Sequence, residues 1–83
     1  MNQVSEIRPM LKDLRKELQT YPGSHYRNIS ERSGFSLGSV SKHLNGEIEP
    51  INKEILRVAV EYRDEMRAKH MMEYEILKKK LAS

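Results

Sequence analysis

The residue types that carry most metal and nucleophilic chemistry are sparse in this chain and poorly spaced for it. The sequence holds no cysteine and three histidines, His25, His43 and His70, which lie far apart from one another. None of them pairs at the i, i+4 spacing that brings two side chains to one face of a helix. Zinc sites draw on ligands at short, regular spacings. We therefore expect no metal site and no cofactor.

The carboxylates do not indicate catalysis either. Asp64, Glu65, Glu73 and Glu75 belong to one long charged segment, where such side chains are ordinarily solvated. The chain also contains no glycine-rich phosphate loop and no arrangement typical of an activated nucleophile. These patterns predict a protein that is not an enzyme.

Residues 25–46 carry the pattern of a helix-turn-helix, two helices joined by the tight turn "SGFS". Such a unit needs an inward aliphatic residue with a small neighbour, a turn glycine with positive φ, an apolar residue after it and a β-branched residue that packs back. The residues at those places are Ile29, Ser30, Gly34, Phe35 and Val40. The second helix then keeps an outward face that is free to enter a major groove of DNA.

The stretch "GFSLGSVSKHLNGEIEP" resembles the helix-turn-helix of phage-repressor, Cro and xenobiotic-response-element-type regulators. The positions that match the family pattern are Gly34, Phe35, Ser36, Ser39, Val40, Ser41, Asn45, Gly46 and Pro50. "SVSKHLNG" is also similar to the reading helix "TVSRVLNG" of lactose-repressor-type domains. The resemblance covers residues 25–62 and implies an all-α, lambda-repressor-like domain that binds operator DNA as a dimer.

Carried over residue by residue, the resemblance implies a set of DNA-contacting residues. Its members are Ser36, Leu37, Gly38, Ser39, Ser41, Lys42, Asn45, Tyr26 and Arg27. In this set Ser36 and Ser39 would bind phosphates. Leu37 would contact a thymine methyl group, and Lys42 would donate to a guanine or a phosphate.

Four positions refine that implication. Tyr26 and Arg27 match positions that hold the DNA backbone. Gly38 stands where relatives carry a polar reader such as glutamine, and His43 stands where a large apolar residue is usual. We interpret Gly38 either as a lost base contact or as allowing close approach of the backbone to DNA, and we favour close approach, with weak base readout that relies partly on DNA shape.

The elements that must position this face are predicted to be three short helices and one long helix, with no strand. The apolar stripe of the first helix consists of Ile7, Leu11, Leu14 and Leu18. Pro9 is expected in its first turn, where a missing N–H costs little, and Pro22-Gly23 ends it. Ser24, Ser36 and Asn52 are predicted to cap the later helices, over residues 25–33, 37–45 and 53–81.

The long helix predicts a dimer. About 30 residues of helix extend about 45 Å, more than so small a domain is wide, so half of it must project. The predicted interface on that half is Met66, Met72, Tyr74, Ile76, Leu77 and Leu81. Lys69 and His70 interrupt the heptad, which favours an antiparallel or splayed pair over a regular coiled coil. A frayed tail is the alternative.

Composition limits the class of protein without identifying it. The chain has 83 residues, 33% of them charged, and a net charge of +3, which permits nucleic acid as a partner but does not single it out. The absence of cysteine, of a membrane-length apolar run and of a signal-peptide layout leads us to expect an intact cytoplasmic protein.

Two functions from different classes follow. In the first, residues 1–62 form a DNA-binding domain that reads the major groove with residues 36–45, and residues 63–83 form a dimerisation segment. The protein would then be a small homodimeric repressor of a phage or mobile-element operon, with no small-molecule ligand. In the second, it is an interaction adaptor or antitoxin that acts mainly through its C-terminal helix.

Overall fold

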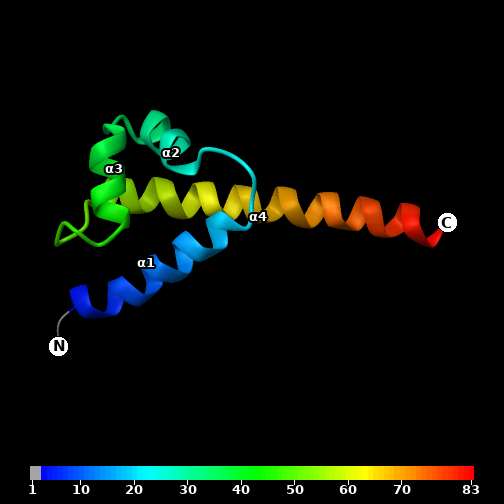
Figure 1. The fold of residues 1–83 in the computed structure, drawn as a ribbon, viewed down its shortest axis with the longest axis horizontal. Coiled ribbons are helices and arrows are strands. Elements are labelled where there is room, and N and C mark those ends of the chain that lie inside the picture. The colour runs from blue at the N-terminus through cyan, green and yellow to red at the C-terminus, as the bar shows by residue number, and fades with distance from the viewer. Residues whose placement is uncertain (1–2) are drawn as a thin grey trace.

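The computed structural model describes residues 3–83, with side chains over residues 7–83. Four helices, and no strand, occur in this part of the chain: α1 (Gln3–Gln19), α2 (His25–Ser33), α3 (Leu37–Leu44) and α4 (Lys53–Ala82). The predicted all-α architecture of three shorter helices and one long helix is confirmed. α1 and the α2–α3 pair flank the first half of α4, and its second half extends alone (Figure 1). No helix within residues 3–83 is both long enough and apolar enough to cross a membrane.

Side-chain caps define the start of two helices. Ser36 and Asn52 have extended backbone and accept hydrogen bonds from N–H groups in the first turns of α3 and α4. Ser24 occupies the N-cap position of α2, as predicted. The prediction that its side chain caps the helix was wrong, because that side chain makes no capping hydrogen bond. Local signals therefore set most of the helix boundaries.

Pro9 departs from its predicted position. α1 begins at Gln3, so Pro9 lies inside the helix and not in its first turn. A proline inside a helix lacks one backbone donor and costs about 3 kcal/mol. Leu11, Leu14 and Leu18 follow it and are all buried. Because each fully buried aliphatic side chain contributes about 1.5–3 kcal/mol, packing of this stripe offsets the proline.

The core lies where the four helices meet. Ile29 of α2, Val40 and Leu44 of α3, and Ile55 and Ala59 of α4 are each 0% exposed. The leucine stripe of α1 joins the same cluster. α3 is therefore held through one apolar face, and its opposite face is left to solvent.

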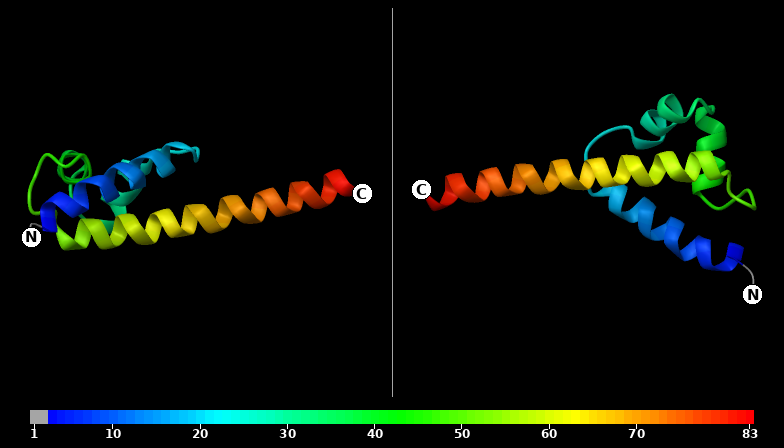
Figure 2. Two further views of the ribbon diagram at one scale, coloured as in Figure 1. Left: turned by 90° about the horizontal axis from the view of Figure 1, so that it is seen from below. Right: turned by 180° about the vertical axis from the view of Figure 1, so that it is seen from behind.

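The second half of α4 projects from this core. Every residue from 67 to 83 is exposed, and the molecule measures 51 × 30 × 16 Å (Figure 2). The predicted interface residues in that half are exposed too: Met72, Tyr74, Ile76, Leu77 and Leu81. Met66 differs, because it is partly buried and packs against the chain's own core.

An ion pair ties α1 to α4 where the projection begins. The Arg67 guanidinium donates from Nε and Nη2 to the two carboxylate oxygens of Glu17, at 2.7 and 2.5 Å. The Tyr21 hydroxyl donates to Glu17 Oε2 at 2.7 Å. The hydrogen bond from Arg67 is the main reason why the pKa of Glu17 falls from 4.5 to about 2, with a smaller contribution from Tyr21.

This pair predicts a loss of stability in acid. A carboxyl group whose pKa is lower in the folded chain stabilises the fold above its unfolded pKa, and that contribution is lost as pH falls through the folded pKa. The part of the unfolding free energy that Glu17 supplies should therefore be complete above pH 4.5 and disappear toward pH 2. Urea unfolding of the wild type and of Glu17→Gln at several pH values measures it. The two proteins should differ at pH 6 and converge near pH 2, and a constant difference would contradict the assignment.

Candidate nucleic-acid interface

The turn between α2 and α3 sets the direction of α3. Gly34 has a φ of 80°, a left-handed conformation that favours glycine, and its N–H donates to the carbonyl of Ser30. The Ser30 hydroxyl donates to the carbonyl of Phe35 at 2.5 Å. The N–H of Phe35 donates to the Ser33 hydroxyl at 3.3 Å. Ser30, the small residue predicted beside Ile29, therefore stabilises the turn between α2 and α3 by a hydrogen bond across it.

α3 divides into a buried face and an outer face. Val40 and Leu44 occupy the buried face. Of the predicted contact residues on α3 and at its two ends, five are exposed and two are half-buried: Ser36, Leu37, Gly38, Lys42 and Asn45, then Ser39 and Ser41. Lys42 makes no ion pair with any described side chain. The outer face therefore presents one available cation among small and polar side chains.

The Ser36 hydroxyl is already engaged at the start of α3. It accepts a hydrogen bond from the N–H of Ser39 at 3.1 Å. A hydroxyl oxygen that caps a helix keeps its own hydrogen as a donor. Ser36 can thus donate to a phosphate oxygen without giving up the cap.

The contacts of His43 account for a polar ring at a position where the regulators that the sequence resembles usually have a large apolar residue. Its Nδ1 accepts a hydrogen bond from the backbone N–H of Asn52 at 3.1 Å. The ring is half-buried between the end of α3 and the start of α4. A polar ring is used here because the loop before α4 leaves a backbone donor that needs an acceptor.

Three of the predicted DNA-contacting residues are hydrogen-bonded to one another within the chain. The Tyr26 hydroxyl donates to Asn45 Oδ1 at 2.7 Å, and Asn45 Nδ2 donates to the Ser41 hydroxyl at 3.2 Å. Burial is the main cause that raises the pKa of the Tyr26 hydroxyl, which keeps it a donor. This chain of bonds joins α2 to the outer face of α3 and positions Asn45 and Ser41. Arg27 is exposed on α2.

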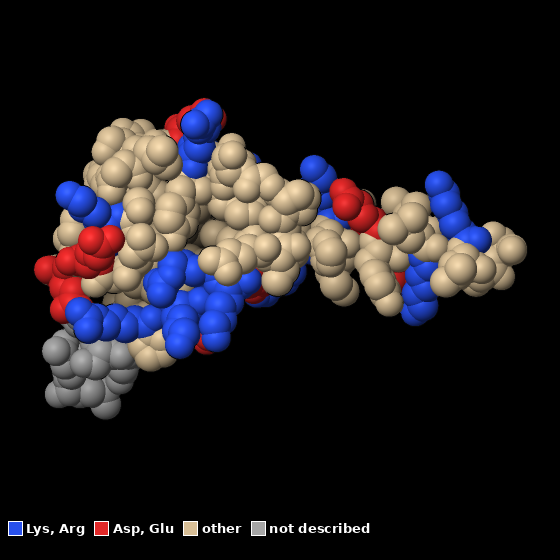
Figure 3. Space-filling view, viewed as in Figure 1, with Lys and Arg blue, Asp and Glu red and all other residues tan. Residues whose placement is uncertain are grey.

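The sequence patterns missed a group of bases on α1. The Arg15 guanidinium donates to the carbonyl of Leu44 at 2.6 Å, at the end of α3. A hollow of about 420 Å³ lies beside that contact, and its lining residues are Arg8, Lys12, Arg15, Asn45 and Gly46. Lys and Arg side chains gather along α1 next to this end of α3 (Figure 3). Their alternation with the leucine stripe was visible in the sequence, but the proximity to α3 was not.

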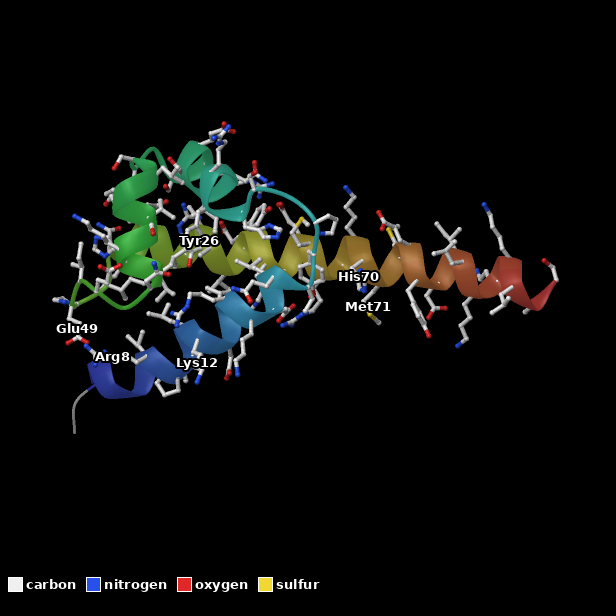
Figure 4. The ribbon with its side chains drawn as sticks, in the orientation of Figure 1. Arg8, Lys12, Tyr26, Glu49, His70 and Met71 are labelled. Atoms are coloured by element: carbon white, nitrogen blue, oxygen red, sulfur yellow. The ribbon has the colours of Figure 1, made fainter. Side chains whose placement is uncertain are left out.

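Within this group the bases differ in availability. Arg8 and Glu49 form an ion pair and point toward each other, whereas Lys12 extends into solvent (Figure 4). Arg15 also places its charge at the C-terminus of α3, where a cation is favourable. We call the residues that line this hollow the α1–α3 surface: Arg8, Lys12, Arg15, Asn45 and Gly46. Lys12 is an exposed base of that surface, and Lys42 is an exposed base on the outer face of α3.

Comparisons of the chain with protein-family models, with curated proteins and with solved structures found no match.

Proposed function

We propose that this protein is a sequence-specific DNA-binding transcription regulator, a small homodimeric repressor of a phage or mobile-element operon. The observation that carries the proposal is the outer face of α3, which the turn and the buried Val40 and Leu44 leave free and which is small, polar and cationic. A helix presented in this way fits the width of a major groove.

The proposed contacts divide into two kinds. Lys42, Lys12 and the Ser36 hydroxyl supply phosphate contacts, which set the orientation of the protein on the duplex and make binding salt-dependent. Leu37, 46% exposed at the start of α3, is placed to meet a thymine methyl group. Asn45 acts mainly by positioning, because its carbonyl oxygen is already bonded to Tyr26.

Gly38 provides a prediction about close approach to DNA. A Cβ at this position would meet nothing within 4 Å, so the fold itself does not require glycine there. Gly38→Ala should raise the free energy of unfolding by about 0.5–1 kcal/mol, since alanine is the better helix former. If the backbone of α3 approaches DNA at this point, the same substitution should weaken binding about tenfold. Urea unfolding and titration of labelled duplex measure the two effects, and greater stability with unchanged affinity would refute close approach.

Selection of bound sequences from a random DNA pool tests the proposal as a whole. A repressor of this kind should enrich two half-sites in inverted repeat, with centres one helical turn apart. Failure to enrich any sequence, at low salt and with a folded dimer, would overturn the proposal. A scrambled pool of the selected composition serves as the control for charge-driven binding.

A second function is favoured by one observation, the apolar side chains left exposed on α4. Met72, Tyr74 and Leu77 are 68%, 59% and 64% exposed. Exposed apolar groups in such density mark a protein-binding surface. In this alternative the chain is an adaptor or antitoxin that binds a different protein through α4, and it would enrich no DNA in the selection.

A further inference from the structure

A groove runs between α1 and the first half of α4. Its volume is about 410 Å³. Six of its lining residues are apolar and four are charged: Ile7, Met10, Leu11, Leu14, Leu56 and Val60, then Asp13, Glu17, Arg63 and Arg67. Met10 on the α1 wall is 67% exposed. The residues that line it all belong to α1 and α4.

One stripe of α4 joins this groove to the projecting end of the helix. Its members follow alternating steps of four and three residues: Leu56, Val60, Arg63, Arg67, His70, Tyr74, Leu77 and Leu81. Residues at these steps share one face of a helix, as in a heptad seam. Leu56, Val60, Arg63 and Arg67 line the groove. The stripe is thus apolar at both ends and polar in its middle.

We propose that the groove of one subunit holds the projecting end of α4 from a second copy of this chain, with the two α4 helices antiparallel. This inference deepens the dimer of the proposed function and rests on it. In the antiparallel register Leu56 meets Leu81 of the second copy, Val60 meets Leu77, and the polar middles meet each other. Met10 and the leucines of α1 then cover the incoming helix from the side.

The charges of the stripe favour this direction. A parallel pair would place Arg63 on Arg63 and Arg67 on Arg67, and like charges in direct opposition are destabilising. In the antiparallel pair Arg63 faces the ring of Tyr74, a favourable arrangement of a cation and an aromatic face. Both arginines also pair within their own subunit, Arg63 with Asp64 and Arg67 with Glu17, which lessens this repulsion without removing it because both pairs are partly exposed.

His70 lies at the centre of the proposed pairing. Its ring packs on the Tyr21 ring, with centroids 5.3 Å apart. His70 and Met71 project from the side of α4 on which α1 lies (Figure 4). The middle of the stripe is therefore ordered by contacts within each subunit before a second copy arrives.

The register also sets the distance between the two reading helices. α3 lies beside the first two turns of α4 (Figure 1). For Ile55 and Val58 in those turns, the equivalent residues of the two subunits are about 30–40 Å apart along the helix axis, at about 1.5 Å per residue. Adjacent major grooves on one side of DNA are about 34–36 Å apart. The antiparallel dimer thus has the span that a two-half-site operator requires.

Disulfide trapping tests the register without DNA, since the natural chain contains no cysteine. Val60→Cys and Leu77→Cys should each fail to cross-link alone under mild oxidation and should cross-link when the two variants are mixed. A parallel coiled coil would give the opposite result, because Leu77→Cys would cross-link with itself. Self-cross-linking of that variant, or no cross-link in the mixture, would overturn the proposal.

A second measurement tests the α1 wall. Met10→Glu places a charge in the groove. Because the Met10 side chain is exposed, the monomer should still fold. Sedimentation equilibrium should show that the dissociation constant of the dimer rises at least tenfold. Gln19→Glu is the matched control, because it adds the same charge to an exposed residue of α1 that lies on the opposite face of that helix from Met10 and does not line the groove. An unchanged dimer with Met10→Glu, or a wild type that stays monomeric at every concentration, would overturn the proposal. A cross-linked dimer that enriches no DNA would instead refute only the proposed function.

Discussion

Lys42→Glu should abolish specific DNA retention, the largest functional effect that we expect from a single substitution. Lys42 is an exposed cation on the outer face of α3 and has no ionic partner among the described side chains. Loss of one good contact costs about 1–3 kcal/mol, and a dimer loses two, so affinity should fall at least about 30-fold. A gel shift on the selected operator measures the loss.

Two controls separate this effect from charge in general and from unfolding. Lys79→Glu makes the same change of charge at the exposed end of α4, and it should leave retention nearly unchanged. The helical circular dichroism of both variants should match that of the wild type, because neither side chain is buried. Equal retention by wild type and Lys42→Glu would refute a role for the outer face of α3.

Ile29→Ala should cause the largest loss of stability among the substitutions considered. Ile29 is 0% exposed and lies in the core cluster with Val40 and Leu44 of α3 and Ile55 of α4. Truncation of a buried isoleucine to alanine costs about 2–5 kcal/mol, a large part of the stability of so small a domain. Urea unfolding followed by circular dichroism measures the change.

Ile76→Ala is the matched control for this prediction. It removes the same atoms from a side chain that is 52% exposed on the projecting half of α4. Ile76 was predicted as an interface residue from the sequence, but it lies outside the stripe of α4 that pairs in the proposed antiparallel dimer. We expect a change within about 0.5 kcal/mol, as for most surface substitutions. Similar losses from both variants would mean that the α2–α3–α4 cluster is not the centre of the cooperative unit.

Much of the fold could be predicted because its signals are local. The Gly34 turn and the Ser36 and Asn52 caps act within a few residues, through backbone conformation and short hydrogen bonds. Pro9 shows where such signals fail. Its local preference for a first turn is overridden by burial of the leucine stripe, which depends on the other helices.

The candidate site was predictable only in part. The outer face of α3 followed from a helical repeat in which Val40 and Leu44 are apolar, so its composition was already visible in the sequence. The hydrogen bond between Tyr26 and Asn45 could not be predicted from the sequence, because it joins α2 to the end of α3. The bases of α1 were missed for the same reason, since the contact of Arg15 with the Leu44 carbonyl and the hollow beside it join residues far apart in the sequence.

The sequence alone determined the helices, the turn and the exposed character of α3, because each depends on neighbours within one or two helical turns. The tertiary structure decided which distant groups lie together: Lys12 and Arg15 of α1 with the end of α3, Met66 with the core, and α1 with the first half of α4 at the groove. Those pairings arise from the angle at which α1 crosses α4. Side-chain packing sets that angle, and no local signal in the chain carries it.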